Sequence, residues 1–103
     1  MTDEGLLGFQ RRFLRAQAHP LRPIIQMGEN GLTKAVLEAL DRALLDHELV
    51  KVRLHQPEDK RATARELARL SSSELCGVVG HTVILYRRHP EEPQIDLPVR
   101  PVR

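Results

Sequence analysis

Residues 23–54 read PIIQMGENGLTKAVLEALDRALLDHELVKVRL, and this stretch decides the fold. Its first five residues form a short segment that contains two β-branched isoleucines and stops at Gly28, which predicts a buried strand over 23–27. The turn GENG follows, Thr33 is placed to cap a helix, and apolar residues keep helical spacing as far as an acidic break at 46–48. The alternating run 48–54 then predicts a second strand. A strand, a helix and a strand in this order favour parallel pairing through a right-handed crossover.

The segments on either side extend this unit. Apolar residues recur at spacings of three and four over 6–18, which predicts an amphipathic helix that Pro20 ends. A charged, largely solvent-facing helix is expected over 58–72. The β-rich runs 75–79 and 82–86 are separated by two residues, Gly80 and His81, as in a tight hairpin.

The predicted element order is therefore α-β-α-β-α-β-β. It indicates a single α/β domain, a two-layer or three-layer sandwich around a mixed four-stranded sheet. We assign residues 1–88 to this domain. Residues 89–103 contain four prolines and are interpreted as a loosely held, proline-rich tail.

Composition limits the class of protein. The chain has 103 residues, 41% of them hydrophobic, with two Phe, one Tyr and no Trp, which allows one domain with an aliphatic core. A single cysteine, Cys76, cannot form an internal disulfide, so a cytoplasmic location is expected. The chain shows neither a long apolar segment nor a signal-peptide pattern, and no membrane association is expected.

Charge is unevenly distributed. The totals of 16 Lys plus Arg and 14 Asp plus Glu give a formal net charge of only +2, yet no acidic residue lies between Gly5 and Gly28. The four arginines of that window are Arg11, Arg12, Arg15 and Arg22. The first three fall within about 100° of a helical wheel, and Lys51 and Arg53 project from one side of the second strand. Nucleic-acid phosphates are natural partners for cations spaced in this way.

The GENG turn is the second candidate feature. It joins a strand to a helix N-terminus, where free backbone amides and the helix dipole favour a phosphate. Lys34, in the first turn of that helix, would become favourable beside such an anion. A GxxG turn is nevertheless a weak signal alone, because many strand-to-helix connections use glycine.

Nothing in the sequence indicates catalysis or a cofactor. The five histidines and Cys76 lack metal-ligand spacings such as CxxC or HxxxH, so neither a metal site nor a cofactor is expected. The serines at 71–73 are interpreted as helix-end and turn residues. The acidic residues at 46–48 are interpreted as a corner between helix and strand.

Two segments carry a resemblance to a known family: FLRAQAHPLRPIIQMGENGLTKAVLEALDRALLDHELVKVRL (13–54) and ELCGVVGHTVILYRR (74–88). The chain resembles the YhbY-like CRM-domain family of RNA-binding proteins, named for chloroplast RNA splicing and ribosome maturation. The resemblance runs from about Leu6 to Arg88 and implies a fold like the C-terminal domain of bacterial initiation factor three. It also implies a non-enzymatic protein that binds RNA through a basic surface and the GxxG loop. Glu29 stands where members often carry Lys.

Charge and resemblance together define the candidate RNA-binding residues. They are Gly28, Glu29, Asn30, Gly31, Thr33, Lys34, Arg11, Arg12, Arg15, Arg22, Lys51 and Arg53. The resemblance further implies precursor large-subunit ribosomal RNA and the pre-ribosomal particle as partners of a monomeric protein assisting subunit assembly. Two alternatives stay open: a regulator that binds other transcripts, and a ribosome-associated module that binds a protein.

Overall fold

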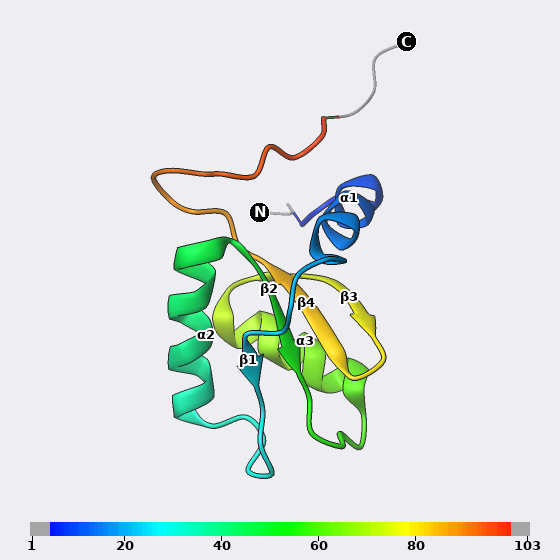
Figure 1. The fold of residues 1–103 in the computed structure, drawn as a ribbon, viewed down its shortest axis with the longest axis vertical. Coiled ribbons are helices and arrows are strands. Elements are labelled where there is room, and N and C mark those ends of the chain that lie inside the picture. The colour runs from blue at the N-terminus through cyan, green and yellow to red at the C-terminus, as the bar shows by residue number, and fades with distance from the viewer. Residues whose placement is uncertain (1–4, 100–103) are drawn as a thin grey trace.

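Three helices surround a four-stranded mixed sheet (Figure 1). The computed structural model describes residues 5–99. The elements are α1 (Gly8–Ala18), β1 (Ile25–Gln26), α2 (Lys34–His47), β2 (Leu49–Arg53), α3 (Lys60–Ser71), β3 (Glu74–Val79) and β4 (Thr82–Tyr86). This order and the single α/β domain confirm the prediction.

The strands lie in the order β1-β2-β4-β3. β1 runs parallel to β2 across the α2 crossover, whereas β4 lies antiparallel between β2 and β3. The predicted hairpin is present, with Gly80 at a φ of +59° in its turn. A register shift between Leu75 and Gly77 interrupts the pairing of β3 with β4.

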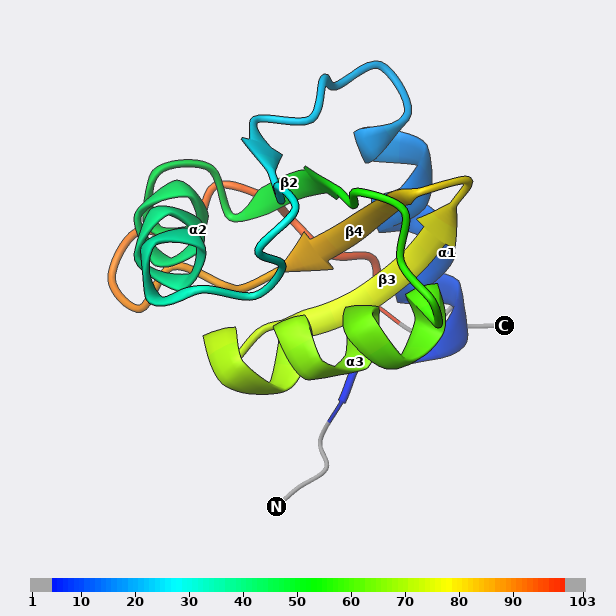
Figure 2. The ribbon, with the colours of Figure 1, turned by 90° about the horizontal axis from the view of Figure 1, so that it is seen from below.

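A hydrophobic cluster lies on each face of the sheet, and different helices cover the two faces (Figure 2). α2 and α3 cover one face, where Leu44 and Leu67 belong to the same buried cluster as Val52. α1 lies on the other face, where Leu14 belongs to a second cluster with Leu49. Because successive side chains of a strand point to opposite faces, the alternation of β2 supplies both clusters. The molecule is thus a three-layer sandwich.

Side-chain caps begin two of the helices. Thr33 Oγ1 accepts the backbone N–H of Val36 at 3.1 Å, as predicted, and Asp59 Oδ1 accepts that of Ala62 at 3.1 Å. The third helix is less solvent-facing than expected. Ala64 and Leu67 are fully buried on its inner side, because α3 is needed to cover the sheet beside α2.

The strand predicted over 23–27 is wrong in extent and burial. β1 has two residues and forms an edge of the sheet, and Ile24 is 52% exposed. Met27, just after the strand, is buried. Pro23 has no N–H with which to extend the ladder along β2, so residues 19–24 form a linker that leaves the sheet edge.

The prediction of a loosely held tail is wrong for residues 89–99. Ile95 and Leu97 pack against the cluster beneath α1, and Gln10 Nε2 donates a hydrogen bond to the Pro98 carbonyl at 3.1 Å. Prolines did not prevent this docking, because the segment lies on the domain without joining a strand ladder. Residues 100–103 lie outside the described part of the chain.

Candidate nucleic-acid interface

A basic groove lies beside α1, on the part of the sheet that this helix leaves uncovered. Its basic side chains are Arg12, Arg15, His19, Lys51 and Arg53. Thr82, Val79 and Ile84 of the hairpin contribute its remaining sheet residues, and its volume is about 700 Å³. No acidic residue lines it within residues 5–99. The groove therefore concentrates positive charge in a protein whose overall charge is nearly balanced.

The β2 alternation places two of these cations. Lys51 and Arg53 lie on the α1 face of the sheet, while Val50 and Val52 face α2 and α3. Lys51 Nζ donates hydrogen bonds to the carbonyls of Leu21 at 2.9 Å and of His19 at 3.3 Å. A cation here satisfies carbonyls just beyond the C-terminus of α1, so Lys51 fixes the linker as well as lining the groove.

The predicted strip of arginines on α1 is divided in the structure. Arg15 Nη1 donates to the Cys76 carbonyl at 2.8 Å, so this guanidinium lies across β3. Arg12 also lines the groove, whereas Arg11 donates to the carbonyl of Leu6 and does not line it. Two of the three helix arginines therefore share the groove with Lys51.

Three predicted cations are available to a ligand. Arg12, Arg22 and Arg53 form neither a hydrogen bond nor an ion pair through their side chains with the residues that the structure describes. Arg22 and Arg53 line a second shallow hollow along β1. Since Arg53 lines both hollows, Arg22 continues the positive surface from the groove to the sheet edge.

The GENG loop continues from the Arg53 end of the groove. Met27, just before the loop, donates its backbone N–H to the Arg53 carbonyl at 2.9 Å. Gly31 N donates to the Gly28 carbonyl at 3.0 Å and adopts a φ of +70°, a conformation in which a side chain would be strained. Glu29 and Asn30 are exposed at the tip, and the hollow beside the loop contains Glu66 and His55.

Two other predicted residues lie differently. The Thr33 hydroxyl serves as the helix cap. Lys34 is exposed on α2 and shares a surface hollow with Glu38 and Asp41, apart from the groove cations. The structure thus brings Arg12, Arg15, Lys51 and Arg53 together, places Arg22 and the loop at one end, and leaves Arg11 and Lys34 outside.

The chain also matches a known protein family and several of its members. The model of the CRS1/YhbY (CRM) domain family matches residues 6–87. The chain belongs to the CRM-domain family. It is 41% identical to "Probable RNA-binding protein YqeI" of Bacillus subtilis, covering 90% of this chain and 99% of that protein. It is 42% identical to "Probable RNA-binding protein PA4753" of Pseudomonas aeruginosa, covering 80% and 81%.

A solved structure agrees with the fold of this CRM domain. The solution structure of the hypothetical protein SAV1595 from Staphylococcus aureus superposes with a TM-score of 0.80 at 36% identity. The comparison covers 90% of this chain and 99% of SAV1595. The predicted resemblance to the CRM family is therefore confirmed, with the family model matching residues 6–87.

The CRM-domain family is non-enzymatic. The one cysteine of this chain, Cys76, is buried. Burial raises the pKa of the Cys76 thiol to about 12, with the charge of Glu74 acting in the same direction, so this thiol is a poor nucleophile. Within residues 5–99, no three His, Cys, Asp or Glu side chains gather as a metal site would require. None of the described helices has the length and apolar character needed to cross a membrane.

Sequence reasoning left two features of the CRM domain out of its site. His19 was not among the predicted RNA-binding residues, although it lines the basic groove. Glu48 was assigned to a corner, and it also accepts backbone N–H groups from three tail residues. An acidic residue between a helix and an apolar strand was the available signal, but its partners lie more than forty positions away.

Proposed function

We propose that this CRM domain binds RNA by holding the sugar-phosphate backbone in the basic groove. The observation that carries the proposal is the grouping of Arg12, Arg15, Lys51 and Arg53 without an acidic neighbour in a protein of net charge +2. Such spaced cations suit phosphates and give little information on base sequence. Arg22 and the 28–31 loop extend the contact, and the amides that open α2 offer a further place for a phosphate. The RNA-binding names of the relatives support the same conclusion.

A salt titration tests this proposal. Each phosphate contact that is lost should reduce the slope of log affinity against log salt by about 0.7 to 0.9. Arg53→Ala and Arg12→Ala are therefore expected to weaken RNA binding and flatten the slope by roughly one contact each. Arg65→Ala is the matched control, because Arg65 is an exposed arginine on α3 and lies outside the groove. Equal affinities for all four proteins would reject the groove as the binding surface.

We further propose that the RNA is the precursor of large-subunit ribosomal RNA and that the protein assists its assembly as a cytoplasmic monomer. Support comes from the family resemblance, with residues 1–88 as the RNA-binding unit and 89–103 as an appended segment. Sedimentation of cell extracts tests the proposal: the protein should travel with free large subunits and their precursors, and be absent from mature ribosomes. Cross-linking that recovers other transcripts without ribosomal RNA would instead indicate a regulator of those transcripts.

A further inference from the structure

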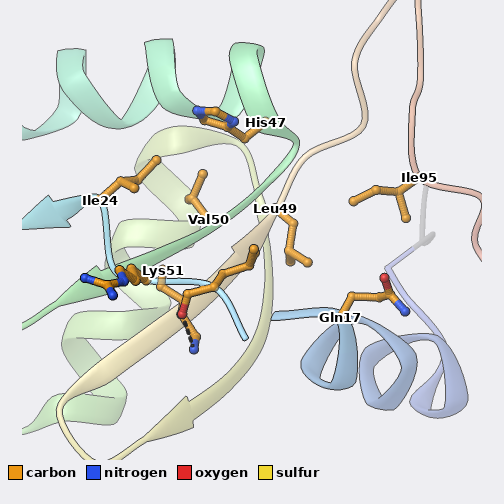
Figure 3. A pocket seen from close by; sticks show the side chains of 9 residues that line it. Gln17, Ile24, His47, Leu49, Val50, Lys51 and Ile95 are labelled. Atoms are coloured by element: carbon orange, nitrogen blue, oxygen red, sulfur yellow. Dashed lines mark hydrogen bonds between the residues drawn. The ribbon is translucent and has the colours of Figure 1, made fainter. Parts of the chain in front are cut away.

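A pocket at the open edge of β2 remains outside the groove. It lies between the 19–24 linker, the C-terminus of α2 and the docked tail, and has a volume of about 380 Å³. Figure 3 shows Ile24, His47 and Ile95 around the β2 residues Leu49 and Val50, with Gln17 on α1. This volume lies within the range of small-molecule pockets. We call it the edge pocket.

The edge pocket has aliphatic walls and a basic rim. Leu21, Ile24, Leu49 and Ile95 supply apolar surface, and Leu21 and Ile24 are 42% and 52% exposed. Arg22, Lys51 and His47 supply the rim, and no acidic residue lines the pocket within the described chain. Glu48, next to Leu49, directs its carboxylate to backbone amides of the tail instead. The pocket thus suits an apolar group attached to an anion.

The walls are fixed by hydrogen bonds. Lys51 Nζ holds the Leu21 carbonyl, and the Ile24 N–H donates to the Lys51 carbonyl at 3.2 Å. On the opposite side, the Ile95 N–H donates to Glu48 at 2.9 Å. A preformed pocket loses less freedom on binding than one that must be assembled.

The strand pairing leaves polar backbone groups facing this pocket. Arg87 N donates to the Glu48 carbonyl and Leu54 N to the His81 carbonyl, so the even-numbered residues of β2 bond to β4. The odd-numbered residues therefore turn their N–H and C=O groups to the other edge, as Lys51 and Arg53 do toward the β1 side. β1 pairs only with Val52 and Arg53 and does not reach Leu49. Leu49 thus presents a donor and an acceptor beside an apolar wall.

We propose that the edge pocket takes an unpaired nucleobase of the bound RNA. A nucleotide offers the flat apolar face of its base, donors and acceptors along the edge of that base, and a phosphate attached through the sugar. The edge pocket complements each of these. Lys51 lines both the edge pocket and the basic groove, so a nucleotide with its phosphate in the groove lies next to the pocket. The inference rests on the proposed RNA-binding function, and it makes single-stranded RNA the preferred ligand, since a paired base is not accessible.

Ile24→Ser tests the proposal with a neutral change at a half-exposed side chain. We expect its affinity for a short oligouridylate to fall about tenfold, the order expected for losing the burial of one apolar group. The salt slope and the affinity for an RNA duplex should stay unchanged, because no phosphate contact is removed. Leu70→Ser, at a leucine of α3 that is 42% exposed against 52% for Ile24, is the matched control and should bind like the unaltered protein. Leu21→Ser replaces Ile24→Ser if the latter fails to fold.

The Leu49 backbone N–H provides a direct readout by nuclear magnetic resonance. Its signal should shift on saturation with oligouridylate in the unaltered protein and not in Ile24→Ser. An unmoved Leu49 signal, or full affinity of Ile24→Ser for oligouridylate, would overturn the base pocket. If Arg53→Ala still weakens binding in that case, the groove proposal survives alone; if the unaltered protein binds no RNA, both fail. If Ile24→Ser loses binding to a protein partner while its RNA affinity is unchanged, the pocket belongs to the interface with that partner. This result would also overturn the proposal.

Discussion

Glu48 Oε1 accepts the backbone N–H of Ile95 at 2.9 Å, across 47 positions of the chain. The same oxygen accepts Gln94 N–H at 2.9 Å, and Oε2 accepts that of His89 at 2.7 Å. Burial acts to raise the pKa of Glu48, but the three amides and the charge of His89 outweigh it, so the pKa lies below its usual value. Glu48 also has a φ of +64° at the end of α2. The ionised carboxylate, at the strained end of α2, therefore fixes the docked tail.

Glu48→Gln should loosen the tail. The Gln carbonyl oxygen can still accept Gln94 and Ile95, but its NH₂ group meets the His89 N–H and cannot accept it. Leaving such a donor unpaired costs about 1 to 3 kcal/mol. Urea unfolding at pH 7 measures the loss, and amide exchange should quicken at His89 first. Asp46→Asn, an isosteric change at an exposed carboxylate two residues earlier, should leave both measurements unchanged.

The same carboxylate predicts a pH dependence with a definite sign. A glutamate whose pKa is lower in the folded than in the unfolded state stabilises the fold above the unfolded pKa, about 4.3, and this contribution disappears as pH falls through the folded pKa. The stability difference between the unaltered protein and Glu48→Gln should be complete at pH 7 and shrink on acidification below about 4.3. Unfolding curves across this range provide the measurement, and a difference that persists undiminished in acid would contradict the assignment.

Local sequence patterns predicted most of the fold. The period of β2, the apolar spacing of α2, the Thr33 cap and the two-residue hairpin turn are each encoded within a few neighbouring residues. The length of β1 and the docking of the tail depend on partners that are distant in sequence. Lys51 selects the path of the linker and Glu48 that of the tail, and neither role can be inferred from spacing alone.

The positive charge of the candidate site could be predicted from the sequence, but which of the basic residues lie together could not. The helical wheel placed three arginines on one strip, yet Arg11 turns to the nearby Leu6 carbonyl while Arg15 reaches β3. The alternation of β2 correctly placed Lys51 and Arg53 on one side. The edge pocket had no signal in the sequence, because it arises where β1 fails to extend along β2 and a distant tail residue closes the gap.

Gly77→Ala should destabilise the domain through Arg15. A Cβ at position 77 would lie 2.7 Å from Arg15 Cδ and 3.3 Å from its Cγ, so the arginine must shift, which disturbs its hydrogen bond to the Cys76 carbonyl. We expect a loss of about 1 to 3 kcal/mol, as for other overpacking changes. In an Arg15→Ala background the same substitution should cost less, and this double-mutant cycle isolates the contact. Gly8→Ala, where no atom lies within 4 Å of the new Cβ, should not destabilise; equal losses at 8 and 77 would contradict the clash.

Cys76 should be unreactive in the folded protein. Its pKa of about 12 lowers the thiolate fraction about a thousandfold relative to an ordinary thiol, and the side chain is buried. A disulfide reagent at pH 8 should therefore modify it slowly in buffer and rapidly in urea. Glu48→Gln frees tail residues that pack against the cluster containing Cys76, so its thiol should react faster than that of the unaltered protein. Rapid modification of the native protein would show that the second core opens readily.

Glu29→Lys should strengthen RNA binding. Glu29 is exposed at the loop that continues from Arg53, and its carboxylate repels a phosphate held by the loop amides. Reversing the charge should raise affinity roughly three- to tenfold at moderate salt and steepen the salt slope by about one contact. Fluorescence anisotropy over a salt series provides both quantities. Glu91→Lys, an identical change on the exposed tail, controls for net charge, and an equal gain there would show that the loop does not contact RNA.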